Sequence, residues 1–131
     1  MSLNVSTALL DRASSGQVPD EPFVACVRDS LPYAWAVIES VATTLHNTPG
    51  IPFADNTTPP PTETDRGQLL RALASDAIRG ALERHFAVTL AFQNCHRVAA
   101  FHPGATDSPA YQEFTSPRSQ LLNQSPELRN C

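Results

Sequence analysis

The sequence predicts a mainly α-helical protein with a minor β component, folded as a single domain over residues 1–131. Apolar residues recur at every third or fourth position in 31–46 and 65–85, which is typical of helices that bury one face. After Phe86 the apolar residues alternate with a period of two, as they do in a pair of strands. We therefore expect a small bundle of about four to six helices, one β-hairpin and a C-terminal tail of short helices.

Three helices are predicted in the N-terminal part of the chain. Ser6 can cap a short first helix. The segment Asp20-Glu21-Pro22 opens a second helix, because proline is tolerated in a first turn, and Pro32 ends or kinks that helix. The third helix carries the apolar stripe Leu31, Trp35, Ile38, Val41, Ala42 and Leu45. At this spacing the ring of Trp35 is expected in the core.

A proline-rich loop is predicted at 47–63, between the third helix and the next one. Its prolines stand at positions 49, 52, 59, 60 and 61, and the run at 59–61 should be extended polyproline II. Long loops in small domains are usually functional or mobile. We expect Phe53 to anchor this loop to the surface of the protein.

The best-defined pattern is the stretch Thr64–Phe101, which we interpret as one long amphipathic helix followed by the hairpin. Thr64 or Asp65 can cap this helix, and Asp65 with Gln68 has the spacing of a capping box. Gly80 lies in the middle of the helix, where a glycine costs about 1 kcal/mol relative to alanine. Close packing of another helix is a plausible reason for a glycine at this position.

The hairpin is expected to turn at Gln93–His96, where Asn94 can adopt the left-handed conformation. The tail, 105–131, is expected to wrap the main body or to reach a second copy. Ser-Pro pairs predict short helices in it at about 109–114, 117–123 and 126–130. Two strands and a sparse tail leave strand edges and apolar surface that one small chain covers poorly, so we predict a homodimer.

The composition excludes several classes of function. All nine basic residues of the chain are arginines, so no lysine is available to form a Schiff base or to act as a general base. A lysine-free chain rich in arginine, alanine and proline is typical of a GC-rich bacterial genome. The net charge is −4 and the arginines are spread along the chain, which argues against nucleic-acid binding.

The expected compartment is the cytoplasm. The first residues lack the pattern of a signal peptide, and no stretch is apolar enough for a membrane span. The three cysteines, at positions 26, 95 and 131, are an odd number without paired spacing, which suits a reducing compartment. No metal and no cofactor is predicted, because Cys95-His96 lacks further ligands at the spacing of a zinc site.

The candidate site is a concave region bounded by the C-terminal end of the long helix, the hairpin and the proline-rich loop. His85 and His96 are the candidate catalytic residues, since a neutral imidazole can act as a general base. Arg84, Arg97 and Tyr33 are the candidate substrate-binding residues. Arg84 falls within the apolar sector of the helix, so it either snorkels to solvent or awaits a carboxylate from a ligand or a neighbour. Paired arginines would suit a carboxylate-bearing ligand.

Two classes of function stay open, and no motif decides between them. The first is a small cofactor-independent tailoring enzyme or helper. It would hold a peptide-like or small natural-product substrate in a groove and assist its modification by proton transfer, for example crosslink formation in a lanthipeptide. The second is a non-catalytic homodimeric interaction or regulatory module that binds a partner protein.

Overall fold

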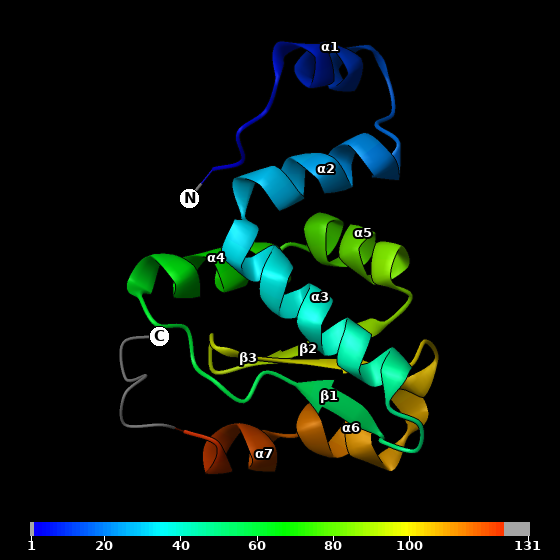
Figure 1. Cartoon of the computed structure of the whole chain (residues 1–131), viewed down its shortest axis with the longest axis vertical. Coiled ribbons are helices and arrows are strands. Elements are labelled where there is room, and N and C mark those ends of the chain that lie inside the picture. Colours follow the sequence, from blue (N-terminus) through cyan, green and yellow to red (C-terminus); the bar gives the residue numbers. More distant parts are fainter. Residues whose placement is uncertain (1, 125–131) are drawn as a thin grey trace.

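The computed structural model describes residues 2–124. Within that range the chain forms seven α-helices, one short 3-10 helix and three strands (Figure 1). In chain order they are α1 (Thr7–Ser15), α2 (Asp20–Ser30), α3 (Pro32–Asn47), β1 (Phe53–Asp55), α4 (Glu63–Leu73), α5 (Asp76–Phe86), β2 (Thr89–Gln93), β3 (Arg97–Phe101), η1 (Ala105–Asp107), α6 (Pro109–Phe114) and α7 (Pro117–Leu122). The predicted mainly α-helical class with a minor β component is confirmed.

The three strands form one antiparallel sheet in the order β1-β3-β2. In the central strand, Ala100 lies opposite Ala54 of β1 and Leu90 of β2. Helix α3 crosses one face of the sheet, and α6 lies against the other face (Figure 1). The sheet is therefore covered by helices on both sides, and only its two edges face away from the helical layers.

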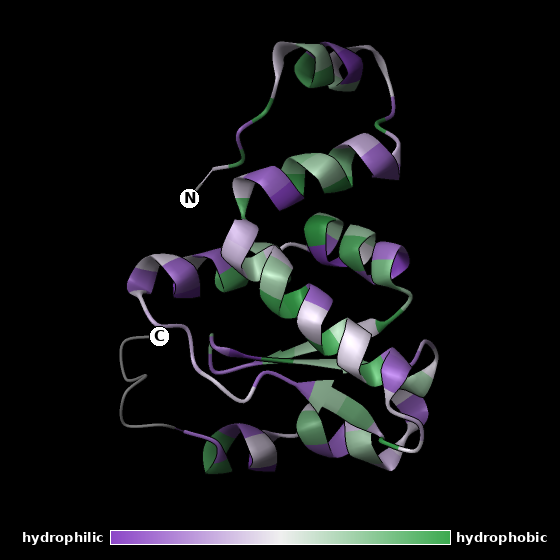
Figure 2. Ribbon diagram, viewed as in Figure 1, coloured by the Kyte–Doolittle hydropathy of each residue, from purple (hydrophilic) through white to green (hydrophobic). Residues whose placement is uncertain are grey.

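The main hydrophobic core lies between α3 and the sheet and is closed by α2, α4 and α5. Its fully buried side chains include Leu31, Ile38, Leu45, Leu69, Ile78, Leu82 and Val98. Trp35 packs against this core and is partly buried. A smaller core on the other face of the sheet joins Phe101 to Phe114. Hydrophobic and polar residues alternate around α2, α3 and α5, as helices with one buried face require (Figure 2).

The proline-rich segment contains a strand that the sequence analysis missed. Phe53–Asp55 pairs with β3, so the sheet has three strands and not only the predicted hairpin. Phe53 anchors the segment as expected, because its ring lies 5.1 Å from that of Phe101 and 5.8 Å from that of Phe114, centroid to centroid. A strand of three residues is too short to show an alternating pattern.

The prediction of one long helix from Thr64 to Phe86 is wrong in one respect, because this segment forms two helices. α4 ends at Leu73, and the hydroxyl of Ser75 then caps α5 by accepting a hydrogen bond from the Ile78 amide at 3.3 Å. The apolar period continues across the break, since both helices bury one face in the same core. Serine is a strong N-cap residue, and Ser75 was the available signal of a new helix start.

Gly80 does not mark a close contact between helices. A Cβ atom at this position would have the Nη1 atom of Arg84 as its nearest neighbour, at 3.3 Å, and that atom ends a flexible side chain. The expectation that another helix packs closely against Gly80 is therefore wrong.

The cap predicted for the long helix is also displaced. Thr62, and not Thr64 or Asp65, caps α4: its hydroxyl accepts a hydrogen bond from the Asp65 amide at 3.1 Å. Gln68 does not belong to a capping box. Its side-chain oxygen instead accepts hydrogen bonds from the amides of Tyr33 and Ala34, at the first turn of α3.

The described part of the tail packs against the sheet on the face opposite α3. Ser108 and Ser116 cap α6 and α7 as the Ser-Pro pairs predict. The side-chain amide of Gln93, at the end of β2, donates to the Phe114 carbonyl and, at 2.9 Å, to the hydroxyl of Ser119. The helix predicted at 126–130 lies outside the described residues.

Candidate functional site

The structure places the predicted site residues in two separate regions. Arg84 and His85 lie in the last turn of α5, one short turn before β2. His96 and Arg97 lie at the other end of the hairpin, since Gln93 is opposite Arg97 and Thr89 is opposite Phe101. The length of a five-residue strand, roughly 13 Å, separates these ends of the hairpin. The expected convergence of these residues at one end of the hairpin is not observed.

Arg84 already has a carboxylate partner within the chain. Its Nε atom donates to Asp20 at 2.6 Å and its Nη2 atom donates to the second oxygen of the same carboxylate at 3.0 Å. These hydrogen bonds lower the pKa of Asp20 and raise the pKa of Arg84. The pair lies at the surface, with 62% of the Arg84 side chain exposed. Arg84 is therefore a solvent-exposed link between α2 and α5, and not a buried guanidinium that awaits a ligand.

His85 lies beside Arg84 and contacts aromatic rings. Its ring centroid is 5.2 Å from that of Trp35 and 4.7 Å from that of Phe86. Arg84 and His85 line a surface hollow of about 680 Å³ between α2 and α5, together with Asp20, Glu21, Val24, Ala25 and Arg28. In the described part of the chain, no hydrogen bond links the imidazole to an acid or to a nucleophile.

His96 and Arg97 hold the turn and the sheet together. The backbone carbonyl of His96 accepts a hydrogen bond from the Asn56 side chain at 2.7 Å, and its ring contacts the Asn94 carbonyl. The Nε atom of Arg97 donates to Asp55 at 2.7 Å, and its guanidinium lies 4.9 Å from the centre of the Phe114 ring. Both members of the Arg97–Asp55 pair are about three-quarters covered. These contacts explain both residues as parts of the fold.

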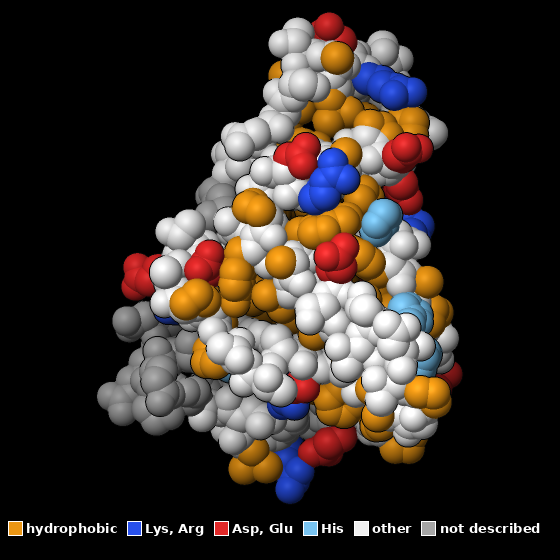
Figure 3. Space-filling view, viewed as in Figure 1, with side chains coloured by type: hydrophobic (Ala, Val, Ile, Leu, Met, Phe, Trp, Pro, Cys, Tyr) orange, Lys and Arg blue, Asp and Glu red, His pale blue; other side chains and the backbone are white. Residues whose placement is uncertain are grey.

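Tyr33 lies in a different hollow, between α3 and the segment that follows β1. We call it the α3 groove. One wall is the outer face of α3, with Tyr33, Ala36, Val37, Ser40, Val41 and Thr44. The other wall is the segment Asp55–Pro61, which contributes Asp55, Asn56, Thr57, Thr58, Pro59 and Pro61. The volume is about 670 Å³. The surface over this part of the molecule is mostly hydrophobic or uncharged (Figure 3).

Side-chain hydrogen bonds fix the second wall of the α3 groove. The Asn56 side chain accepts from the Val98 amide at 2.8 Å, and its own amide group donates to His96. Asn56 thus continues the β1–β3 pairing with its side chain. Because Asp55 is tied to Arg97 at the same place, the segment leaves the sheet in a defined direction. These hydrogen bonds hold the Asp55–Asn56 end of this wall in place.

Tyr33 lies at the end of the groove near the start of α3. The hydrogen bonds from Gln68 hold the first turn of α3, where Tyr33 lies. Partial burial raises the pKa of the Tyr33 hydroxyl, and the negative charge of Asp65 raises it further. Tyr33 is therefore protonated at neutral pH, and its hydroxyl can donate a hydrogen bond.

The residues of the α3 groove other than Tyr33 were missed by the sequence analysis. Ser40 and Thr44 stand four positions apart on one face of a helix, and Val37 and Val41 do the same beside them. This pattern looks like an ordinary boundary between a buried and an exposed face. The proline-rich loop was expected to border the site, and it borders this groove, but the opposite boundary was expected at the long helix and the hairpin and not at α3.

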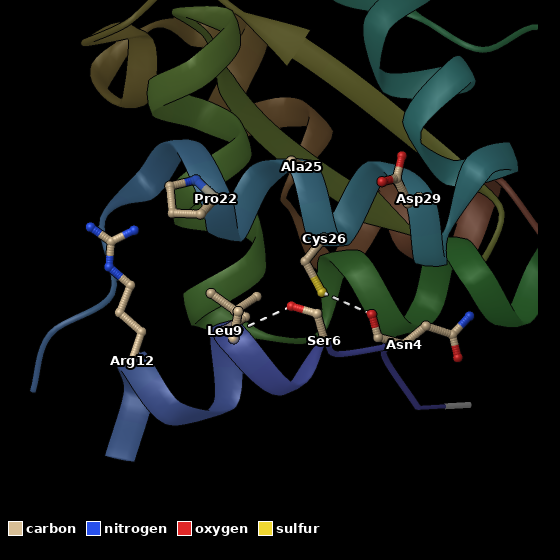
Figure 4. A pocket seen from close by; sticks show the side chains of 9 residues that line it. Asn4, Ser6, Leu9, Arg12, Pro22, Ala25, Cys26 and Asp29 are labelled. Atoms are coloured by element: carbon tan, nitrogen blue, oxygen red, sulfur yellow. Dashed lines mark hydrogen bonds between the residues drawn. The ribbon is translucent and has the colours of Figure 1, made fainter. Parts of the chain in front are cut away.

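A third hollow, of about 370 Å³, lies between α1 and α2 (Figure 4). Cys26 is a free thiol there, and its Sγ atom donates to the Asn4 carbonyl at 3.4 Å. Cys95, by contrast, is disulfide-bonded, so it is not a thiolate candidate. The disulfide at Cys95 counts against the reducing compartment that was expected from the number and spacing of the cysteines.

Neither a metal cluster nor a membrane span is found between residues 2 and 124. Over that range, no group of three or more His, Cys, Asp or Glu side chains is placed to hold a metal ion. Over the same range, no helix has the length and apolar character that crossing a membrane requires.

A family model described as NucS shadow ORF matches residues 1–131, which is the whole chain. No curated protein and no solved structure shows significant similarity to the chain.

Proposed function

The chain belongs to the family described as NucS shadow ORF, and we propose that it is a non-catalytic interaction module. In this proposal the α3 groove binds an extended, uncharged segment of a partner protein. The proposal rests on three properties of this groove, namely its volume, its hydrogen-bonded second wall and its lack of an unpaired charge. Its volume of about 670 Å³ falls within the roughly 300–1,000 Å³ of ordinary ligand pockets, and hydrogen bonds hold Asp55 and Asn56 of its second wall in place.

The lining of the α3 groove suits a polypeptide backbone. An extended segment carries amide and carbonyl groups that need hydrogen-bond partners when they leave water. Ser40, Thr44 and Thr57 offer hydroxyls that can both donate and accept. Val37 and Pro59 offer apolar surface for small side chains between those polar groups. This alternation supports binding of a peptide more than binding of a compact polar metabolite.

The charge of the groove argues against an ionic ligand. Asp55 is the one charged residue among the described residues that line it, and Arg97 neutralises Asp55 at 2.7 Å. A carboxylate-bearing ligand would need an unpaired cation, but Arg84 and Arg97 both already bind carboxylates of the chain. An uncharged segment therefore fits the α3 groove better than the carboxylate ligand expected from the sequence.

The tailoring-enzyme prediction stays untested, and no described contact supports it. His85 packs on aromatic rings, and His96 contacts the carbonyl of its own turn. A general base must reach the proton that it removes, with a reacting group held about 3 Å away. Ser40 and Thr44 have hydroxyl groups in the groove. No histidine is among the described residues that line it.

The family description names a reading frame and not an activity, so the proposal requires that the product of this frame is a folded protein. Local signals agree with the fold along the described chain. Five helices begin with a capping hydroxyl, from Ser6, Thr62, Ser75, Ser108 and Ser116. Such agreement between local preference and global structure is typical of sequences that specify one fold. Mass spectrometry should detect tryptic peptides of this frame in cells that transcribe the gene, and their consistent absence would remove the proposal.

A cytoplasmic location is part of the proposal. The free thiol of Cys26 supports it, whereas the disulfide at Cys95 counts against it. Thiol alkylation of the protein in intact cells would decide the question. A reduced Cys95 supports the cytoplasm, and an oxidised Cys95 favours another compartment.

The binding proposal is tested by selection of peptides from a random phage-displayed library, followed by matched variants of α3. Ser40→Arg places a large charged side chain in the groove without disturbing the core, because Ser40 is exposed. Thr43→Arg is the control, since Thr43 is also exposed on α3 but does not line the groove. We expect the selected peptides to lose most of their affinity for Ser40→Arg and to bind Thr43→Arg as they bind the wild type. Equal binding to all three proteins would contradict the proposal.

A further inference from the structure

The α3 groove gives a partner little backbone to pair with. Inside α3 the amides and carbonyls beside the groove bond to one another along the helix. In the second wall Asp55 ends β1, and the chain from Asn56 to Pro61 is not a strand. Pro59 and Pro61 in this wall have no N–H group to donate. A segment in the groove therefore cannot bond to this wall in the way that an added strand bonds to an open strand edge.

Side-chain hydroxyls are the donors that the groove offers instead. Ser40, Thr44 and Thr57 line it, and all three residues are exposed. Between residues 2 and 124, no hydrogen bond is found for any of these hydroxyls, so each proton is available to a carbonyl oxygen of the ligand. An ordinary extended segment would also bring one N–H group per residue, and each N–H group that leaves water needs an acceptor. A segment without N–H groups avoids this cost and still uses the donors of the groove.

We propose that the partner segment is proline-rich and binds as a polyproline II helix, an inference that rests on the proposed binding of an extended segment in this groove. Proline has no amide proton, and a polyproline II helix has no internal hydrogen bonds, so its carbonyls remain free to accept. These carbonyls accept from the hydroxyls of Ser40, Thr44 and Thr57. The proline rings pack on the apolar surface of Val37 and Pro59.

The exposure of the groove also favours a ligand that is ordered before it binds. Ala36, Ser40 and Thr44 are exposed, and Val37 is only half-buried, so the ligand covers a shallow surface. The burial of little apolar area gains little free energy, and a flexible peptide would lose more conformational entropy than this gain offsets. The proline ring fixes φ in the free peptide, so a proline-rich segment loses less entropy when it binds.

The length of the α3 wall sets the length of the bound segment. The wall extends from Tyr33 to Thr44, which corresponds to a rise of about 16.5 Å along the helix. A polyproline II helix rises about 3.1 Å per residue. A segment of about five or six residues that runs along α3 therefore spans the groove.

The test compares two end-capped, uncharged peptides of about six residues, binding to the full-length protein. One consists of proline, and the other alternates threonine with valine, which favours a strand. Fluorescence anisotropy of the labelled peptides measures both affinities. We expect the proline peptide to bind the wild type about tenfold or more tightly than the threonine–valine peptide. Its binding should be lost in Ser40→Arg and kept in Thr43→Arg, because Thr43 does not line the groove.

A matched pair of variants tests the role of the hydroxyl donors. Thr44→Val removes one hydroxyl from the groove and keeps the shape of the side chain, and Thr43→Val makes the same change at an exposed position of α3 outside the groove. The affinity for the proline peptide should fall about three- to tenfold in Thr44→Val, as the loss of one hydrogen bond predicts, and should not change in Thr43→Val. Equal affinities of the two variants would overturn the inference.

The outcomes separate this inference from the proposed function on which it rests. If the threonine–valine peptide binds as tightly as the proline peptide, and Ser40→Arg blocks both, the polyproline II inference is wrong and binding in the α3 groove stands. If Ser40→Arg blocks neither these peptides nor the library-selected ones, both proposals are wrong.

Discussion

The side-chain oxygen of Gln68 accepts a hydrogen bond from the backbone amide of Tyr33 at 2.7 Å, across 35 positions of the sequence. The same oxygen accepts from Ala34 at 3.2 Å. Leu31, the N-cap residue of α3, provides no side-chain cap, so α4 supplies the cap from outside the helix. This contact fixes the start of α3 and with it the Tyr33 end of the α3 groove.

Gln68→Ala should lower the free energy of unfolding by about 1–2 kcal/mol, because two amides at the start of α3 lose their acceptor. Urea denaturation measures this loss. Gln68→Glu is the control, since a carboxylate keeps the acceptor and is favoured at a helix N-terminus. If the alanine variant is as stable as the glutamate variant, the cap does not contribute.

The two ion pairs of the predicted site should differ in their importance for stability. Arg97→Ala breaks a largely covered pair with Asp55 and a contact with the Phe114 ring, and should cost about 1–2 kcal/mol. Arg84→Ala breaks a pair at the surface and should leave the melting temperature within a few degrees. Thermal unfolding of both variants makes the comparison. A larger loss for Arg84→Ala would contradict the assignment of Arg97 as the structural residue.

Tyr33 should make the wild type lose stability at high pH. Its folded-state pKa is raised by burial and by Asp65, so the folded state holds the phenol proton more tightly than the unfolded state does. The contribution of Tyr33 to the free energy of unfolding is fully present below about pH 10, and it is lost as the pH rises through the folded-state pKa of Tyr33. Tyr33→Phe removes this dependence. The difference in unfolding free energy between the two proteins, measured from pH 8 to 11, should change only above about pH 9. A difference that is constant over this range would show that the pKa of Tyr33 is the same in both states.

Gly80→Ala should stabilise the protein by about 0.5–1 kcal/mol, because alanine loses less backbone entropy in a helix. The new methyl group would meet only the flexible end of Arg84, which can shift by a few tenths of an ångström. Chemical denaturation measures the gain. A destabilised alanine variant would mean that the Arg84–Asp20 pair cannot adjust.

The sequence predicted the elements whose signal is local. The stripe through Ile38 and Leu45, the cap at Ser6 and the Ser-Pro starts at Ser108 and Ser116 each depend on residues a few positions apart, and all are confirmed. Asn94 adopts the left-handed conformation expected at the turn.

The missed features depend on partners that are distant in the sequence. Strand β1 exists because Phe53 pairs with Phe101, and Arg84 is explained by Asp20, which is 64 positions away. The pairing of charges across such distances is set by the fold and leaves no pattern in a single sequence. The α3 groove was missed for the same reason, because its two walls come from α3 and from the segment after β1.

The most direct test of the account is a nuclear magnetic resonance titration of the labelled wild-type protein with a library-selected, uncharged peptide. Binding in the α3 groove predicts shifts of the amide signals of Val37, Ser40, Thr44 and Thr57, with the signals of Arg84 and His85 unchanged. The opposite pattern, with shifts at Arg84 and His85 and none at Ser40 or Thr57, would contradict the central claim and return the site to the C-terminal end of α5.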